Sequence, residues 1–424
     1  MTTRRQFITY SGLSILSGSI VSCTGGQKAG GSGEIEFWTM QLQPKFTGYF
    51  QDLIAKFEQA NPGTKVKWVD VPWSGMESKI LAAMQAKTAP DVVNLNPDFA
   101  AQLAAKNAWL ELDSKLANGE SKQYLPGMWK ANTLGDKRFG LPWYITTNIT
   151  IYNQELFKKA GIAQPPKTYQ ELAQVAKQIK DKTKKYAFFA TLVPEDANDV
   201  LESLVQMGVE LVNASGQAAF DTPAGQAAFQ YWVDLYMQGL LPKEILTQGH
   251  KQGMQLYQSG EIALLSAGAP AVNDIAKNAP RIATVSAIAP QISGQTGKIS
   301  VAVMNMVVPR TTKNPDMAVK FALFVTNAAN QLAFANNSDT LPSQVQAIAD
   351  YQTKMKASDK SALAQGKIVS ASQLNKAEVL IPPMKDIGLL KKAIYENLQT
   401  AMLGEKNVDQ AIKLAAKTWD NRSK

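Results

Sequence analysis

Cysteine and histidine are almost absent from this sequence. Its 424 residues include one cysteine, Cys23, and one histidine, His250. A single cysteine cannot form an intrachain disulfide, and one residue of each kind nearly excludes a cysteine–histidine zinc site. We therefore expect neither a metal nor a cofactor. His250 lies in a stretch rich in Gln, Gly and Lys, which favours a surface position over a catalytic one.

The sequence also lacks an apolar run of the roughly 18 residues that a membrane-spanning helix needs. Basic residues outnumber acidic ones, and the formal net charge is +9. A basic chain can bind nucleic acid or an anionic surface, but these lysines are scattered among Gln, Ala and Asp. Their densest run, Lys180 to Lys185, is typical of a solvated helix end, so we expect no nucleic-acid partner.

The first 33 residues have the layout of a targeting signal rather than of a folded segment. Arg4 and Arg5 precede a short apolar run that ends in Ile20-Val21-Ser22-Cys23. This order is that of an export signal, and its ending resembles a bacterial lipobox, in which the cysteine receives lipid. The arginine pair resembles a twin-arginine signal, although the general secretory route stays open. We predict a signal peptide over 1–22, lipidation at Cys23, and a flexible Gly-rich tether over 23–33.

The remaining chain alternates between strand and helix patterns, and its length suits two domains. Residues 34–40, 66–71 and 91–95 read as strands, with helical patterns at 46–57 and 76–86 between them. This order predicts a parallel sheet with helices on both faces. The alternation resumes with strands near 149–152, 186–192, 262–266 and 300–308. Helices are expected over 168–179, which opens with a Thr168–Glu171 capping box, and over 226–237 and 316–325.

Four stretches, in order along the chain, carry a family resemblance. They are Ala89-Pro-Asp-Val-Val93, the run from Gly140-Leu-Pro-Trp-Tyr144 to Leu172, Tyr257 to Leu264, and Val308 to Asp316. With these motifs the chain resembles extracellular solute-binding protein family 1, the maltose-binding-protein-like sugar-binding lipoproteins of ATP-binding cassette importers. The resemblance implies the two-lobed α/β periplasmic-binding-protein fold of type II, with a ligand cleft between the lobes and several crossovers. It places 34–142 and about 271–326 in lobe 1, and 143–270 and about 327–424 in lobe 2.

Ligands of open α/β sheets bind beyond the carboxyl ends of the strands. Aromatic rings there would cover the apolar faces of a sugar, and amides and carboxylates would bind its hydroxyls. We assign the tryptophans within predicted strands, helices or packed turns to the core: Trp68, Trp109, Trp129, Trp232 and Trp419. An Asp or Asn after a strand can instead be a helix cap. The candidate ligand residues are Trp38, Gln41, Trp73, Asn96, Asp98, Trp143, Tyr144, Glu195, Gly268 and Asn305.

Two departures from the family pattern leave the sugar's identity open. A tryptophan often follows the strand near residue 263, but this chain has Gly268-Ala269-Pro270, and Val303-Met304 replaces a common Gly-Gly pair. The resemblance implies a monomeric importer subunit outside the cytoplasmic membrane. It would be lipid-anchored, would bind a sugar or sugar-like polyol, and would deliver it to permease subunits.

Several alternatives remain open from the sequence. A phosphorylated polyol would require arginines such as Arg138, Arg281 or Arg310, and a quaternary amine would require an aromatic cage. A glycoside hydrolase would require a facing pair of carboxyls, for which Glu195 and Asp196 are the candidates. Because these two are adjacent in sequence, their side chains need not converge, and we expect no enzyme activity. A purely structural lipoprotein is a further alternative.

Overall fold

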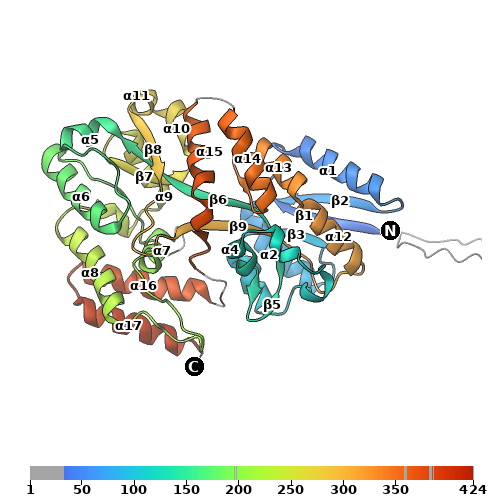
Figure 1. Ribbon diagram of the computed structural model, residues 1–424. Coiled ribbons are helices and arrows are strands. Elements are labelled where there is room, and N and C mark those ends of the chain that lie inside the picture. Colours follow the sequence, from blue (N-terminus) through green and yellow to red (C-terminus); the bar gives the residue numbers. More distant parts are fainter. Residues whose placement is uncertain are drawn as a thin grey trace, which may run out of the picture.

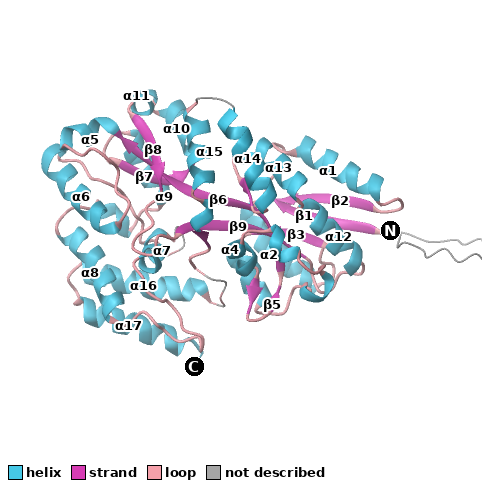
Figure 2. Ribbon diagram, viewed as in Figure 1, coloured by secondary structure: helices cyan, strands magenta, loops and turns pink. Residues whose placement is uncertain are grey.

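The computed structural model describes residues 33–194, 196, 198–357, 361–381, 384 and 386–423. Two α/β lobes lie on either side of a narrower waist, and strands run through the waist from one lobe to the other (Figure 1, Figure 2). The expected two-lobed architecture with crossing strands is confirmed. The predicted export signal, Cys23, the tether up to residue 32 and Glu195 lie outside the described residues.

The first lobe is built on the predicted parallel sheet. β1 pairs with β2 on one side and with β3 on the other, all in the same direction. Their carboxyl ends therefore face the waist and the second lobe (Figure 1). The elements of this lobe are β1 (Glu34–Met40), α1 (Thr47–Ala60), β2 (Lys65–Val71), α2 (Trp73–Gln85), β3 (Val92–Leu95), α3 (Pro97–Ala104), α4 (Pro126–Ala131), the hairpin β4 (Thr133–Leu134) and β5 (Lys137–Arg138), and α12 (Pro315–Val325).

Aromatic side chains fill the core of the first lobe. Phe50 and Phe57 lie on one stripe of α1 at helical spacing, and both are buried. Phe37 of β1 meets the edge of Phe321 from α12, with ring centroids 5.1 Å apart. Burial of such rings contributes much of the stability of a domain core.

Two long antiparallel strands, β6 (Gly140–Asn153) and β9 (Ile299–Val307), cross the waist together. The end of β9 pairs with β3 of the first lobe. The second half of β6 pairs with β7 (Leu264–Gly268) on one edge and with β8 (Ser286–Pro290) on the other. One continuous strand therefore belongs to both lobes, and its register shifts between Pro142 and Ile145.

The second lobe is mainly helical around β7, β8 and the second half of β6. The predicted capping box of Thr168 and Glu171 opens α6 and is confirmed. The elements are α5 (Gln154–Ala160), α6 (Tyr169–Thr183), α7 (Asp199–Gln206), α8 (Pro223–Met237), α9 (His250–Gln258), β7, α10 (Ala271–Asn278), α11 (Pro280–Thr284), β8, α16 (Ile387–Met402) and α17 (Val408–Asp420). Short pieces elsewhere are η1 (Asp113–Lys115), η2 (Glu120–Gln123), η3 (Lys243–Leu246), η4 (Leu374–Lys376), β11 (Ala377–Glu378) and η5 (Asn421–Ser423).

The lobe boundaries differ from the expected ones in two places. Residues 271–290 were expected in lobe 1, but Ala271, Ile275 and Ile282 pack with Ile149 in the second lobe. The cause is β8, which stays on the edge of β6, so that the chain returns to lobe 1 only along β9. Residues 327–372 were expected in lobe 2, but most of them cover the waist.

One face of the waist is covered by helices. Ile145, Val301 and Val303 of the crossing strands point to this side and are buried in a cluster with residues of α14 and α15. Phe334 of α13 instead reaches into the core of the first lobe. The covering elements are α13 (Ala328–Asn337), β10 (Leu341–Pro342), α14 (Val345–Ala357) and α15 (Ala362–Ser372).

The expected strand over 186–192 is only partly formed. Tyr186 makes an isolated parallel bridge with Ile262. The chain then leaves the sheet, and residues 188–190 line a cavity instead of pairing with a neighbour. Within the described residues, none of the helices combines the length and the apolar character that a bilayer crossing requires.

Candidate functional site

One face of the two crossing strands is left exposed at the waist. Thr146 of β6 and Ala302 of β9 lie opposite each other, and both are exposed, while their neighbours Ile145 and Val303 are buried. A cavity of about 430 Å³ lies beside Thr146 at the edge of β6. It reaches the covering helices, because Phe334 of α13 and Lys367 and Ser370 of α15 also line it. Its walls come from the loop after β1 (Leu42, Lys45, Phe46), from residues 144–148 of β6, from residues 268–270 after β7, and from the segment 338–341.

The loop after β1 is held in place by one carboxylate that the sequence did not single out. The hydroxyl of Thr39 and the backbone N–H groups of Leu42 and Gln43 all donate to Asp70 of β2, at 2.6–3.0 Å. Asp70 therefore fixes one wall of the hollow from behind, as a positioning residue.

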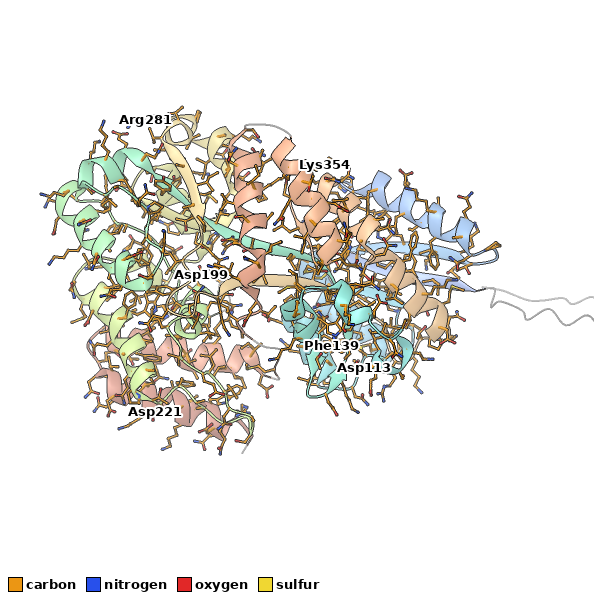
Figure 3. The ribbon with its side chains drawn as sticks, in the orientation of Figure 1. Asp113, Phe139, Asp199, Asp221, Arg281 and Lys354 are labelled. Atoms are coloured by element: carbon orange, nitrogen blue, oxygen red, sulfur yellow. The ribbon has the colours of Figure 1, made fainter. Side chains whose placement is uncertain are left out.

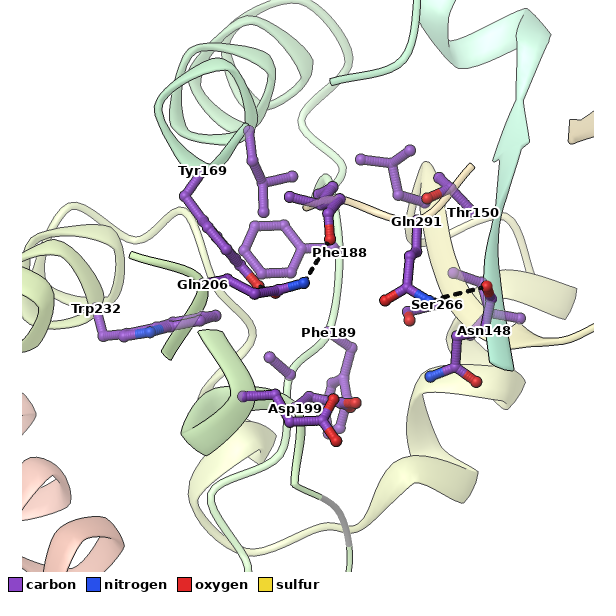
Figure 4. Close-up of a pocket in the computed structure, with 16 residues that line it drawn as sticks. Asn148, Thr150, Tyr169, Phe188, Phe189, Asp199, Gln206, Trp232, Ser266 and Gln291 are labelled. Carbon is purple, nitrogen blue, oxygen red and sulfur yellow. Dashed lines mark hydrogen bonds between the residues drawn. The ribbon is translucent and has the colours of Figure 1, made fainter. Parts of the chain in front are cut away.

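A second cavity, of about 100 Å³, lies within the second lobe beside this hollow (Figure 4). Asn148 lines both cavities, so they are neighbours. Helices α6 and α7 and the segment 188–190 form one side, and β6, β7 and residues 291–292 form the other. The lining residues are Asn148, Thr150, Tyr169, Leu172, Phe188, Phe189, Ala190, Asp199, Glu202, Gln206, Trp232, Leu264, Leu265, Ser266, Gln291 and Ile292.

Two glutamines hold the walls of this second cavity together. Gln206 accepts a hydrogen bond from the hydroxyl of Tyr169, and its amide donates to the carbonyls of Ile292 and Lys298. Gln291 donates to Thr147 and to the carbonyl of Ser300, while its carbonyl accepts from the N–H of Ser300. Both side chains are used by the protein, so they shape the cavity and leave ligand binding to their neighbours.

Two acids of α7 face the cavity and have raised pKa values. Burial raises the pKa of Glu202 to about 7, and the negative charge of Asp199 adds to this effect, while the hydroxyl of Ser300 opposes it. Burial also raises the pKa of Asp199, and His250 acts in the opposite direction. Raised carboxyl pKa values in a cavity are a frequent mark of functional sites.

The electrostatic environment extends across the waist. Asp98 of the first lobe contributes to the raised pKa of Glu202, and Lys391 of α16 lowers it. Burial raises the pKa of Asp98 itself, and Lys391 opposes this shift. A charged group of the first lobe therefore affects the pKa of an acid in the second lobe. Figure 3 shows the position of Asp199 in the second lobe.

Aromatic rings supply the apolar part of the cavity. Phe188 and Trp232 meet edge to face at 6.1 Å, and the indole N–H of Trp232 donates to the hydroxyl of Ser203 at 2.9 Å. Tyr169 lies beside Gln206 on the same side (Figure 4). The sequence analysis placed Trp232 in the core and singled out neither Tyr169 nor Phe188 for ligand contact. The feature of the sequence that could have indicated this site is the pair of acids Asp199 and Glu202 in the first turn of α7.

Trp143 requires the largest correction. It was expected to stack on a ligand at the mouth of the cleft, but its exposed fraction is 0%. Its indole ring stacks on Phe334 at 4.8 Å and meets Phe50 at 6.0 Å, inside the core of the first lobe. Tyr144, which follows it, is buried against Phe334 but lines the 430 Å³ hollow.

Trp38 and Asn305 are also interior residues. Trp38 lies in the middle of β1, its indole N–H donates to Glu36, and Lys79 of α2 covers its ring at 4.4 Å. Asn305 is 0% exposed and pairs with Leu95 between strands. Neither of its side-chain amide atoms has a hydrogen-bond partner within the described residues. Both residues are covered because the sheet buries the positions that the sequence placed near strand ends.

The remaining candidates lie at the waist-facing ends of the strands. Gln41 accepts a hydrogen bond from the N–H of Trp73 at 3.4 Å, and Trp73 is 46% exposed. Asn96 caps α3 by accepting from the N–H of Phe99 at 2.8 Å, as the alternative reading allowed. Asp98 lies two residues later, in the first turn of α3, where its surface is open to solvent but the surrounding protein raises its pKa. Gly268 lines the 430 Å³ hollow.

A larger hollow, of about 1000 Å³, lies between α4 and residues 374–380. Its aromatic member, Trp129, is covered by the guanidinium of Arg138 at 3.7 Å, and Arg138 also donates to the carbonyl of Trp129. That ring face is therefore occupied by the protein itself. Among the described residues, no group of three or more His, Cys, Asp or Glu is placed to hold a metal ion.

Comparison with known proteins gives consistent results. A model of the bacterial extracellular solute-binding protein family matches residues 43–332. A crystal structure from Synechococcus sp. MITs9220, assigned provisionally as an oligosaccharide periplasmic-binding protein and also described with zinc, is 40% identical. The match spans 91% of this chain and 98% of the Synechococcus chain, with a TM-score of 0.83.

Two more distant proteins share the fold or much of the length. The cyclic α-maltosyl-1,6-maltose binding protein of Arthrobacter globiformis is 20% identical with a TM-score of 0.78, covering 92% of this chain and 98% of its own. The galactooligosaccharide-binding protein of Bacillus subtilis (strain 168) is 23% identical over 87% of this chain and 85% of its own.

Proposed function

Because the chain belongs to the bacterial extracellular solute-binding protein family, we propose that it captures a carbohydrate or polyol outside the cytoplasmic membrane and delivers it to an ATP-binding cassette permease. The observation that carries this proposal is the hollow beside Thr146, with its neighbouring cavity of aromatic, amide and carboxylate groups. Such a lining suits a ligand with apolar ring faces and many hydroxyls.

The fold is that of type II periplasmic solute-binding proteins. Members of this fold close about a hinge between their lobes, and here the two crossing strands occupy that position. A ligand that touches Asp98 of the first lobe and Glu202 of the second would favour the closed form, because only there are both contacts made.

The family and the fold are those of binding proteins, and the site supports a role without catalysis. Asp196, one of the two carboxylates considered for a hydrolase, accepts a hydrogen bond from the backbone N–H of His250 at the start of α9. It is thus engaged in holding a helix end. The proposal further includes a lipid anchor at Cys23, a monomeric state and a location on the outer face of the membrane.

The direct test is ligand binding by the domain that begins at Gly33. A thermal-shift screen against neutral mono-, di- and oligosaccharides and polyols should raise Tm for at least one class, since a ligand that binds only the folded state stabilises it. Titration calorimetry then gives Kd. Absence of binding by every carbohydrate and polyol would contradict the proposal, and so would turnover of any of them.

A further inference from the structure

The cavity of the second lobe carries charge of one sign. Among the described residues, its charged lining side chains are Asp199 and Glu202, and no Lys, Arg or His lines it. Lys391 lies near enough to affect Glu202, but its ammonium donates to Asn198 at 3.0 Å. His250 acts on Asp199 from α9. Both cationic side chains therefore stand outside the described lining, and the charged side chains that line the cavity are acids.

The two carboxylates have acceptor capacity that the protein does not fill. An ionised carboxylate offers about four acceptor positions. The hydroxyl of Ser300 lies near enough to Glu202 to lower its pKa, and the carboxylate of Asp199 accepts no hydrogen bond from the described part of the chain. Acceptor positions that the protein leaves open can bind donors of a ligand, so a ligand that brings hydroxyl groups can bind to both acids.

The opposite wall offers groups that both donate and accept. Thr150 and Ser266 pair across β6 and β7, and Asn148 lies two residues before Thr150 on the same face. All three line the cavity, and Ser266 is exposed although it lies within a strand. Figure 4 shows Asn148, Thr150 and Ser266 across from Asp199, with Phe188 and Trp232 on the α6–α7 side.

We infer that this cavity holds one uncharged polyol group of the ligand, and that Asp199 and Glu202 exclude ligands that carry phosphate or carboxylate there. The inference rests on the proposed function and narrows its ligand class. Hydroxyls donate to the two carboxyl groups and exchange hydrogen bonds with the opposite wall, whereas an anionic group would face two acids with no cation among the described lining residues.

The size of the cavity supports a single group. A volume of about 100 Å³ corresponds to roughly seven to ten water positions, at 10–15 Å³ each. This suits one sugar ring or a glycerol-sized end. A longer ligand would extend from it into the neighbouring 430 Å³ hollow, past the shared residue Asn148.

Matched pairs of neutral and phosphorylated probes test the inference. The pairs are glucose and glucose 6-phosphate, glycerol and glycerol 3-phosphate, sucrose and sucrose 6-phosphate, and trehalose and trehalose 6-phosphate. Each is titrated into the wild type, Asp199→Asn, Glu202→Gln and the double variant. Glu210→Gln is the control, because Glu210 is exposed and does not line the cavity.

We expect a neutral probe to bind at least tenfold more tightly than its phosphorylated partner. Asp199→Asn and Glu202→Gln should each weaken neutral binding about tenfold, and the double variant should lose most of the preference. Circular dichroism confirms that the variants fold. Equal or tighter binding of the phosphorylated partner, or an unchanged preference in the double variant, overturns the inference and leaves the proposed function standing. Failure of every neutral and phosphorylated probe to bind overturns both.

Discussion

Glu202 should make the unliganded protein less stable as the pH rises, and Glu202→Gln should remove this effect. Burial holds the folded pKa of this carboxyl at about 7, against an ordinary value of 4.5. The folded state therefore binds the proton more tightly than the unfolded state. The stability linked to that proton is complete below pH 4.5 and is lost as the pH rises through 7.

The size of the effect follows from the shift. Each pKa unit is worth about 1.4 kcal/mol, so a shift from 4.5 to about 7 corresponds to roughly 3 kcal/mol at most. Partial exposure of the carboxyl reduces this figure, and we expect about 1–3 kcal/mol between pH 5 and pH 8. Gln keeps the shape and has no charge, so its variant should lack this part of the pH dependence.

Urea unfolding at pH 5 and pH 8 measures the effect directly. The difference in unfolding free energy between Glu202→Gln and the wild type should grow in favour of the variant by about 1–3 kcal/mol from pH 5 to pH 8. Glu210→Gln, at an exposed site, should follow the wild type at both values. Parallel pH profiles for the wild type and Glu202→Gln would refute the reasoning, because the carboxyl would then titrate alike in both states.

Other residues give distinct outcomes. Trp143→Ala should lower the unfolding free energy by about 3–5 kcal/mol, as for other buried aromatics, and Trp143→Phe by less. Calorimetry on either folded variant should return the wild-type Kd, and a weaker Kd at unchanged stability would contradict the core assignment. Trp73→Ala, at an exposed position, should change stability by less than about 0.5 kcal/mol and weaken ligand binding about tenfold; an unaltered Kd would remove Trp73 from the site. Binding of a neutral probe should tighten from pH 5 to pH 8, because hydroxyl donors favour the ionised form of Glu202, and the pH profile should flatten in Glu202→Gln. Cys23→Ala should move the protein from the membrane to the soluble fraction, and retention equal to the wild type would argue against lipidation.

The sequence was sufficient for the elements whose pattern is local. The alternation over 34–95 predicted the parallel sheet, because the spacing of apolar residues that distinguishes a strand from a helix is a property of neighbouring residues. The Thr168–Glu171 capping box marked the start of α6 for the same reason. Both features need no information from distant parts of the chain.

Trp143 shows where such reasoning stops. The sequence placed an aromatic residue at the boundary between lobes, but the side of the strand that it occupies depends on the register shift between Pro142 and Ile145. A shift of one residue exchanges the two faces of a strand. The shift arises from pairing with β9, about 160 residues later, and Trp143 stacks on Phe334, which is more distant still.

The second-lobe cavity was out of reach for a similar reason. Tyr169, Phe188 and Trp232 come from three segments whose local patterns are those of ordinary packed residues. Their common role appears only when α6, α8 and the segment after Tyr186 are brought together. A motif within one stretch of sequence does not indicate which distant segments the fold brings together.

The interleaved path of the chain also constrains the order in which the protein can fold during synthesis. The first lobe begins at β1, yet its sheet needs Asn305–Val307 of β9 beside β3. The second lobe needs α16 and α17, whose Leu390, Ile394 and Trp419 share a core with Trp232. Contacts so far apart in sequence close slowly, because long loops must be ordered first. The first lobe can complete its core once Phe334 of α13 has been made, whereas the second must wait for α16 and α17 near the end of the chain. A nascent chain therefore stays incompletely folded until translation is nearly finished.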